Sequence, residues 1–261
     1  MSEESVLLER PETGLAVVTL NRPARMNALD LAMWERLRTV VESCNDDESL
    51  RCVILRGAGG KAFAAGADIA EFQENRFSAA QAEAYAERMH PALEGIAHSP
   101  HPTLAFIEGA CVGGGLEIAL MCDLRLSNAS GRFGVPINRL GHVLPYEGLQ
   151  PLVQLVGRAV ALEILLEGRI LDAQEALMKG LINRVLPDET AWDEALVSAR
   201  RIAKGAPLAA HGHKLFTRRA LDPRPLDEAE QKAVFAPCDS EDYREGVRAY
   251  LEKRLPRFTG R

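Results

Sequence analysis

The sequence has no excess of positive charge. Its 261 residues include 31 basic and 37 acidic side chains, so the formal net charge is −6 with histidine neutral. A general nucleic-acid-binding function is therefore disfavoured, because such proteins present a basic surface to the phosphates. A local basic patch could still bind an anionic ligand, since net charge does not describe a single pocket.

Cysteine is scarce, and its pattern favours reduced thiols. The five cysteines are scattered, odd in number and contain no Cys-x-x-Cys pair. This pattern argues against both a disulfide framework and a structural zinc site. We therefore expect a cytoplasmic protein with free thiols and no metal. The five residues are Cys44, Cys52, Cys111, Cys122 and Cys238.

Long apolar runs are also missing. No run approaches the roughly 18 residues of a membrane span. The acidic start of the chain lacks the basic and apolar regions of a signal peptide. Hydrophobic residues make up 47% and charged residues 26% of the chain, as in ordinary globular proteins. We expect a soluble protein with one sizeable core and no membrane partner.

Apolar patterns that alternate between strand and helix periods predict an α/β fold with parallel pairing. We expect a core over residues 1–200 and a helical region over residues 201–261. Predicted strands lie at residues 6–8, 15–20, 52–55, 103–107 and 123–127. Predicted helices lie at residues 29–43, 79–96 and 115–121, with Asp30 and Ser78 as N-caps of the first two. Further helices are predicted at residues 159–166, 173–178, 190–203, 208–220, 226–234 and 239–254.

Two glycine-rich segments, residues 57–69 and 109–117, each follow a predicted strand. The second also opens a helix, so its free backbone N–H groups should point at a negative or partly negative oxygen. Nucleotide-binding motifs do not fit. A Walker A loop needs serine or threonine after Gly-Lys, but Ala62 follows Lys61, and G-x-G-x-x-G from Gly57 would need glycine at 62. A plain turn remains the alternative for either loop alone.

Several segments, in the right order, resemble a known family. Residues 21–29, Asn-Arg-Pro-Ala-Arg-Met-Asn-Ala-Leu, resemble the entry motif of crotonase-fold proteins. Residues 61–69 and 113–123, which contain Ala-Gly-Ala-Asp and Gly-Gly-Gly-Leu-Glu, resemble their two oxyanion loops. Residues 133–136 resemble the segment before the second catalytic position, and residues 239–261 the terminal helix and tail. The chain therefore resembles the enoyl-CoA hydratase/isomerase (crotonase) superfamily over nearly its whole length.

The resemblance implies a crotonase-type spiral of ββα units with a C-terminal helical trimerisation region, assembled as homotrimers or dimers of trimers. The substrate would be an acyl-CoA thioester, with coenzyme A as part of the substrate and no prosthetic group. The Ala67 and Gly114 amides would donate to the thioester carbonyl oxygen, which gains negative charge as an enolate forms. Glu117 matches the first of two catalytic glutamates and would act on water or on an α-proton. A solvated helix glutamate is the alternative.

The resemblance also implies where coenzyme A binds. Arg25 lies where the family often has a cation near the phosphates. Tyr250 and Lys253 match terminal-helix positions that reach coenzyme A, often from a neighbouring subunit, and they should share a helical face because they are three apart. Ala70 departs from the family, whose hydratases often have lysine there, so one phosphate contact is missing. The residues assigned to coenzyme A are Arg25, Met26, Ala67, Asp68, Ile69, Tyr250 and Lys253, of which Asp68 is expected mainly to order its own loop.

A second departure is Ile137, which stands where the hydratases have their second catalytic glutamate. Hydration needs a base for water and an acid for the α-carbon, and paired carboxylates divide that work. Water addition would rest on Glu117 alone or would use another group near the pocket. His142, Tyr146 and Glu147 are the candidates, and packing or surface roles are their alternatives. Some decarboxylating relatives have Pro-Tyr at a similar place, but the spacing here is longer.

The leading hypothesis is an enoyl-CoA hydratase, a lyase of fatty acid metabolism that adds water to a 2-enoyl-CoA. An enoyl-CoA isomerase needs only one base, so it tolerates Ile137 better. An acyl-CoA decarboxylase and a protein that binds acyl-CoA without turnover are the other hypotheses. The acyl-chain preference depends on the shape made by residues 71–90 and 136–149.

Overall fold

The computed structural model describes residues 4–261, whose strands form two sheets. The larger sheet has the strand order β1-β2-β3-β5-β7-β10 and the smaller has β4-β6-β8-β9. Neighbouring strands are parallel except for the β1–β2 and β8–β9 pairs. The larger sheet contains β1 (Val6–Glu12), β2 (Leu15–Leu20), β3 (Cys52–Gly57), β5 (Thr103–Ile107), β7 (Leu124–Asn128) and β10 (Arg184–Leu186). The smaller contains β4 (Ala62–Ala64), β6 (Ala110–Val112), β8 (Arg132–Gly134) and β9 (Leu171–Asp172).

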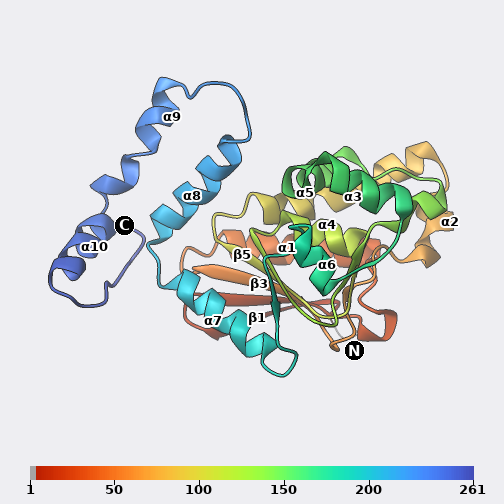
Figure 1. Ribbon diagram of the computed structural model, residues 1–261, viewed down its shortest axis with the longest axis horizontal. Helices are drawn as coiled ribbons and strands as arrows, with labels where there is room; N and C mark the ends of the chain where they lie inside the picture. The colour runs from red at the N-terminus through yellow and green to blue at the C-terminus, as the bar shows by residue number, and fades with distance from the viewer. Residues whose placement is uncertain (1–3) are drawn as a thin grey trace.

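The helices lie around the two sheets and in an arm at the C-terminal end (Figure 1). Those of the main body are α1 (Leu31–Asn45), α2 (Phe72–Asn75), α3 (Ala79–Ala97), α4 (Gly114–Met121), α5 (Tyr146–Glu167), α6 (Ala173–Met178) and α7 (Ala191–Ala203). The arm contains α8 (Pro207–Arg219), α9 (Glu228–Ala233) and α10 (Glu241–Leu251).

Three times in succession, the chain forms one strand in the larger sheet, then one strand in the smaller sheet, and then a helical segment. β3 and β4 precede α2 and α3, β5 and β6 precede α4, and β7 and β8 precede α5. Because β4, β6 and β8 are parallel neighbours, their carboxyl ends lie at one edge of the smaller sheet. The spiral therefore brings the loops that follow these three strands together.

The larger sheet is buried on both faces, which explains its continuous apolar strands. Ile54 and Phe106 pack against α7, in a cluster that also contains Ala195 and Ala199. The side chains that alternate with them belong to a second cluster, formed with α1, α3, α4 and the smaller sheet. The alternation of side chains along each strand thus divides one apolar run between two cores.

The N-caps predicted from the sequence are confirmed. The Asp30 carboxylate accepts from the Met33 amide at 2.8 Å, and the Ser78 hydroxyl oxygen accepts from the Gln81 amide at 3.2 Å. Each side chain thus satisfies one of the free N–H groups at its helix start. The predicted start of the first helix at residue 29 is two residues early.

Helix α5 differs most from the prediction, because it begins at Tyr146 rather than near residue 159. Its 22 residues have a mean hydropathy that would suit a membrane span by length and composition alone. The expectation that no apolar run approaches that length is therefore wrong at α5. Gly157, however, has φ 75 and ψ 163, which are not helical angles and divide α5 into two shorter pieces.

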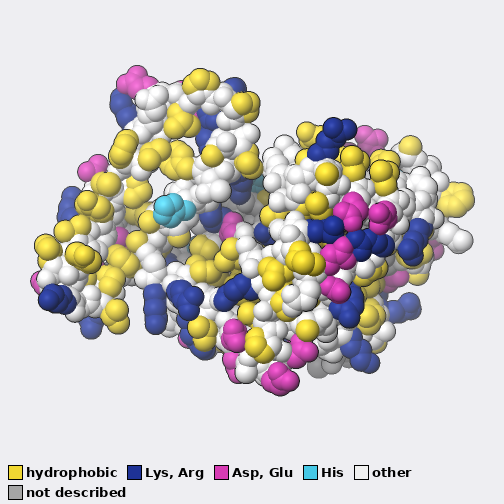
Figure 2. Space-filling model, viewed as in Figure 1, with side chains coloured by type: hydrophobic (Ala, Val, Ile, Leu, Met, Phe, Trp, Pro, Cys, Tyr) yellow, Lys and Arg dark blue, Asp and Glu magenta, His cyan; other side chains and the backbone are white. Residues whose placement is uncertain are grey.

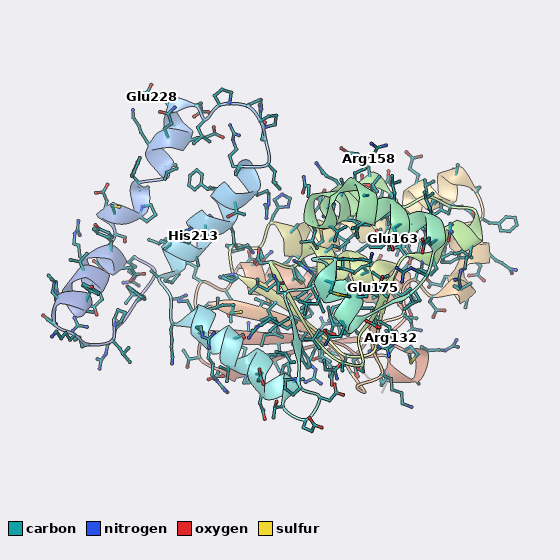
Figure 3. All side chains as sticks on the ribbon, viewed as in Figure 1. Arg132, Arg158, Glu163, Glu175, His213 and Glu228 are labelled. Atoms are coloured by element: carbon teal, nitrogen blue, oxygen red, sulfur yellow. The ribbon has the colours of Figure 1, made fainter. Side chains whose placement is uncertain are left out.

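The C-terminal arm extends from the main body, as Figure 1 shows in blue. Lys214 of α8 joins the two parts, since its ammonium group lies 2.7 Å from the Asp123 carboxylate and donates to the His101 carbonyl at 2.6 Å. Figure 2 shows hydrophobic side chains along the arm, and Figure 3 places His213 and Glu228 there, away from Glu163 and Glu175 of the main body. The exposed apolar residues of the arm include Leu221, Phe235, Tyr243, Tyr250, Leu251 and Leu255.

Candidate active site

The two glycine-rich loops meet where β4 and β6 end. Gly66 has a positive φ of 101, and a Cβ on it would lie 3.1 Å from the Val112 carbonyl oxygen and 3.7 Å from the Gly114 amide nitrogen. A larger residue would therefore push the loops apart, and its backbone would be strained. Glycine at this position lets the two main chains come into direct contact.

The Ala67 amide is held free by the hydrogen bonds on either side of it. The Leu29 amide donates to the Gly66 carbonyl at 2.8 Å, and the Asp68 amide donates back to the Leu29 carbonyl at 2.8 Å. In extended backbone, successive N–H groups point to opposite sides, so the Ala67 amide points away from Leu29. Within residues 4–261 it has no protein acceptor.

The Gly114 amide is free for a different reason. Gly113 is the N-cap of α4 and has no side chain that could cap the helix. The first amides of a helix lack intrahelical acceptors, and the Gly114 amide finds none elsewhere in the described chain. Gly115 fixes the position of this helix end, since a Cβ there would lie 2.3 Å from the Ala64 carbonyl oxygen of β4.

Glu117 lies on the first turn of α4, three residues after the free Gly114 amide. Its side chain is buried, with 7% of the residue exposed, and its Oε1 has no hydrogen-bond partner among the described residues. Gly148, near the start of α5, lies over this carboxyl group: a Cβ there would be 2.7 Å from Oε1. Burial raises the pKa of Glu117 to about 7. A carboxyl group that titrates near neutral pH can both accept and return a proton under physiological conditions.

The raised pKa predicts a pH-dependent stability difference between the wild type and Glu117→Gln. In the unfolded chain Glu117 ionises near its usual 4.5, whereas in the folded chain it stays protonated until about pH 7. The wild type should therefore lose about 3 kcal/mol of unfolding free energy relative to the variant as pH rises through this window, with no further loss above it. Urea unfolding of both proteins at pH 5 and pH 8 measures the change. An equal difference at both pH values would contradict the raised pKa.

The structure separates the three candidates for a second acid or base. His142 is partly buried, and burial together with the charge of Arg76 lowers its pKa, so its imidazole is neutral at pH 7. Tyr146 is 68% exposed, and the Glu147 carboxylate lies 3.6 Å from His90. Ile137 is partly buried and packs against the main core. Two of the three are linked electrostatically to Glu117: His142 shares the Arg76 charge with it, and the Glu147 charge adds to the effect of burial in raising the pKa of Glu117.

The entry motif has a structural role that the sequence analysis did not assign. Asn27 is fully buried, and its amide group donates to the Ala58 and Ala62 carbonyls at 3.0 and 2.8 Å. Arg22 forms ion pairs with Asp30 at 3.0 Å and Asp68 at 3.1 Å. These contacts join the motif to the first glycine-rich loop. The sequence shows the asparagine and the arginine, but it does not show that they are buried or paired, or which residues they contact.

Residues predicted to bind coenzyme A near the first loop lie at the surface. Arg25 and Met26 are exposed, and Ile69 is 65% exposed. Asp68 orders its own loop: its carboxylate accepts from the Ala70 amide at 3.2 Å and pairs with Arg22. Although burial acts to raise the pKa of Asp68, these two contacts hold it below its usual value. The exposed side chains leave this surface open to a ligand.

The two predicted residues of the C-terminal segment do not share a helical face. Helix α10 ends at Leu251, and Lys253 has a positive φ of 54. The left-handed conformation at Lys253 turns the chain back toward α10, so the shared-face expectation is wrong. Tyr250 is 84% exposed.

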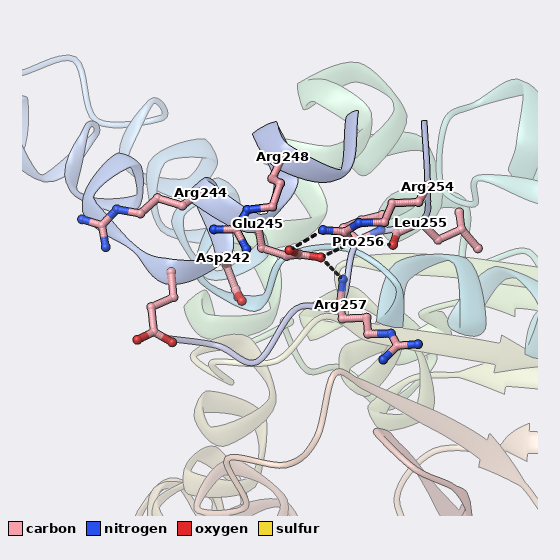
Figure 4. Close-up of a pocket in the computed structure, with 9 residues that line it drawn as sticks. Asp242, Arg244, Glu245, Arg248, Arg254, Leu255, Pro256 and Arg257 are labelled. Carbon is pink, nitrogen blue, oxygen red and sulfur yellow. Dashed lines mark hydrogen bonds and ion pairs between the residues drawn. The ribbon is translucent and has the colours of Figure 1, made fainter. Parts of the chain in front are cut away.

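An open cavity of about 940 Å³ lies along α10 and the tail that follows it, and its charged lining residues are four arginines, Glu241, Asp242 and Glu245 (Figure 4). Arg254 pairs there with Glu245 at 2.6 Å. Arg244, Arg248 and Arg257, which also line it, form no ion pair with any described residue. The lining thus carries a small excess of positive charge in a chain that is acidic overall.

Arg76 is a residue near the site that the sequence analysis did not select. It lies between α2 and α3. For His142, burial is the larger effect on the pKa, and burial and the Arg76 charge both lower it. For Glu117, burial is again the larger effect and raises the pKa, whereas the Arg76 charge acts to lower it. The sequence signal was weak, because an arginine between two helices is usually a solvated surface residue.

Comparisons of the sequence give a consistent family. A family model described as enoyl-CoA hydratase/isomerase matches residues 10–261. A probable enoyl-CoA hydratase of Mycobacterium tuberculosis is 34% identical over 264 residues, with 100% of each chain covered. A crotonyl-CoA hydratase of Syntrophomonas wolfei is 34% identical, with 99% of each chain covered.

Comparisons of the structure confirm the predicted crotonase-type α/β fold. A crystal structure of an enoyl-CoA hydratase/carnitine racemase from Magnetospirillum magneticum superposes with a TM-score of 0.97 at 50% identity, covering 100% of this chain and 97% of that one. A putative enoyl-CoA hydratase/isomerase family protein from Hyphomonas neptunium superposes with a TM-score of 0.92 at 36% identity, covering 99% and 98%.

Proposed function

Because the chain belongs to the enoyl-CoA hydratase/isomerase family, we propose that it is an enoyl-CoA hydratase that adds water to a 2-enoyl-CoA. The observation that carries this proposal is the buried Glu117 carboxyl group, unpartnered at Oε1, on the helix whose first amide is free. Relatives named enoyl-CoA hydratase and crotonyl-CoA hydratase, aligned along essentially the full chain, support the choice of reaction.

In the proposed mechanism, the Ala67 and Gly114 amides donate hydrogen bonds to the thioester carbonyl oxygen. Ionised Glu117 accepts a proton from water as the water oxygen bonds to C3, and the electron pair of the double bond moves toward C2 and the carbonyl. The two fixed amides stabilise the enolate oxygen without having to reorganise. Protonated Glu117 then returns the proton to C2, so one carboxyl group serves as both base and acid.

Coenzyme A enters the proposal as part of the substrate, and no prosthetic group is required. The exposed surface of Arg25, Met26 and Ile69, beside Ala67 and Asp68, would hold the nucleotide and pantetheine. Tyr250 and Lys253 would reach coenzyme A from a neighbouring subunit. The unpaired arginines around the α10 cavity support the proposal that the C-terminal segment contacts the phosphates of coenzyme A.

Association as a homotrimer or a dimer of trimers is part of the same proposal. The arm presents a row of exposed apolar side chains, and such surfaces mark protein interfaces. We place the enzyme in the cytoplasm, and its five free cysteines suit a reducing compartment.

The test is turnover of crotonyl-CoA in deuterated water, with the products resolved by mass and NMR. The hydratase proposal expects 3-hydroxybutyryl-CoA with deuterium at C2. Exchange or migration of protons without added water would instead establish the isomerase, for which the single carboxyl group at Glu117 and the apolar Ile137 are the supporting observations. Loss of carbon dioxide from a carboxylated acyl-CoA would establish a decarboxylase. Binding of acyl-CoA without any product would make the protein a non-catalytic binder.

Ile137→Glu is expected to raise kcat for hydration by about tenfold or more, because it supplies a second carboxyl group for proton transfer. Ile137→Gln is the matched control, since glutamine is close to glutamate in size and is also polar but cannot ionise. Initial rates with crotonyl-CoA, together with the melting temperature of each variant, measure the effect. A folded Ile137→Glu variant that is no faster than Ile137→Gln would show that a missing carboxylate does not limit the rate.

A further inference from the structure

Arg76 has an unusual setting for an arginine between two helices. Its guanidinium carbon lies 4.7 Å from the ring centroid of Phe72 and 4.7 Å from that of Tyr85. Contacts with two aromatic rings hold the planar group in place and reduce its contact with water. The guanidinium is therefore ordered in advance of any ligand.

No acidic side chain within residues 4–261 forms an ion pair with Arg76. Among the described residues it forms no ion pair within 4.0 Å and donates no side-chain hydrogen bond. The carboxylate of the neighbouring acid Glu71 is held by another group instead, because it accepts a hydrogen bond from the Leu31 amide at 3.0 Å. A partly buried cation without a partner is costly, and an anionic ligand would offset that cost.

The position of Arg76 relates it to the candidate active site. Tyr85, which contacts its guanidinium, is buried, and its hydroxyl donates to the Leu29 carbonyl at 3.4 Å. The backbone of Leu29 in turn forms hydrogen bonds with Gly66 and Asp68, the residues on both sides of Ala67. The charge of Arg76 also acts on Glu117 and His142, which belong to α4 and to the loop before α5. Arg76 is thus within electrostatic range of both residues, and it belongs to the segment expected to surround the acyl chain.

We propose that Arg76 binds a carboxylate carried by the acyl chain of the substrate, so that the enzyme prefers 2-enoyl-CoA thioesters with a negatively charged end. The inference rests on the proposed hydratase function and names its substrate class. A guanidinium fits a carboxylate with two parallel hydrogen bonds, which a neutral acyl chain cannot accept. The carboxylate takes no part in the reaction: water adds across C2 and C3 as before.

The first test compares two substrates of equal chain length, glutaconyl-CoA, which ends in a carboxylate, and 2-pentenoyl-CoA, which does not. In the wild type, kcat/KM should be higher for glutaconyl-CoA. Arg76→Gln should lower the ratio of the two kcat/KM values by about 10- to 100-fold. The ratio is the appropriate measure, because the loss of the Arg76 charge also alters Glu117 and so affects both substrates. Arg38→Gln, which removes an exposed arginine of α1 paired with Glu42, is the matched control and should leave the ratio unchanged.

The second test does not depend on turnover. Calorimetry gives the Kd values of glutaryl-CoA and pentanoyl-CoA, which are saturated and unreactive, for the wild type and Arg76→Gln. The wild type should bind glutaryl-CoA more tightly, and the variant should lose that preference. If the wild type hydrates neither enoyl-CoA but keeps the preference in Kd, the hydratase function is wrong and the carboxylate site stands. If both substrates are hydrated and neither ratio changes in Arg76→Gln, the carboxylate site is wrong and the hydratase function stands.

Discussion

Glu117→Gln is expected to lower kcat for crotonyl-CoA hydration by about 10²- to 10⁴-fold, the range that general acid–base groups contribute. Glutamine keeps the size of the side chain but can neither accept the proton of water nor return it to C2. The wild-type rate should rise with pH and level off above about pH 7, because the base is the ionised form of a group with a pKa of about 7. The residual rate of the variant should lack that rise. Initial rates between pH 5 and pH 9 measure both effects.

Glu147→Gln is the matched control for this experiment. Glu147 is the other carboxylate whose charge acts on Glu117, but its own carboxylate lies near His90. Its variant should therefore stay within a few-fold of the wild type. Equal losses in the two variants would mean that Glu147, rather than Glu117 alone, takes part in proton transfer. A Glu117→Gln variant with wild-type activity would remove Glu117 from the mechanism.

Gly114→Pro is expected to lower kcat by about 10²- to 10³-fold, because proline has no amide hydrogen to donate to the enolate oxygen. The substitution suits the backbone, since Gly114 is the first residue of α4 and proline is favoured at that position. The added atoms, however, crowd the site: a Cβ at Gly114 would lie 3.2 Å from side-chain atoms of Leu29 and Trp34.

Gly114→Ala separates crowding from the loss of the hydrogen bond. It adds the same Cβ but keeps the amide, so the ratio of kcat between the alanine and proline variants measures the donor. Circular dichroism and the Kd of a saturated acyl-CoA establish that both variants fold and bind. If the alanine and proline variants are folded and equally active, the Gly114 amide is not a donor to the transition state.

The sequence predicted the strands of the larger sheet better than those of the smaller one. β2 and β5 are runs of five or six buried residues, and their bounds agree with the prediction. β4, β6 and β8 have three residues each, too few to establish a period of two, and they form only because the spiral stacks them. The early part of α5 escaped notice for another reason, since Pro151 and Gly157 interrupt its helical pattern.

Site residues divide in the same way. Glu117 and the two glycine-rich loops were identified because their motifs are continuous in the sequence. Arg76 and Gly148 were not, because what distinguishes them is a contact between side chains or segments that no motif links: the Phe72 and Tyr85 rings for Arg76, and the Glu117 carboxyl group for Gly148. The shared face expected for Tyr250 and Lys253 failed because helix spacing was assumed beyond the end of α10.

The contact between the Gly66 and Gly114 backbones has a consequence for how this protein can evolve. If the proposed hole is built from main-chain amides, most amino-acid replacements at the positions that donate leave the donors in place. Residues that face the acyl chain, such as Arg76, belong to a different segment and are joined to the hole only through intermediate contacts. Mutation can therefore alter which acyl group is accepted while enolate stabilisation is inherited unchanged.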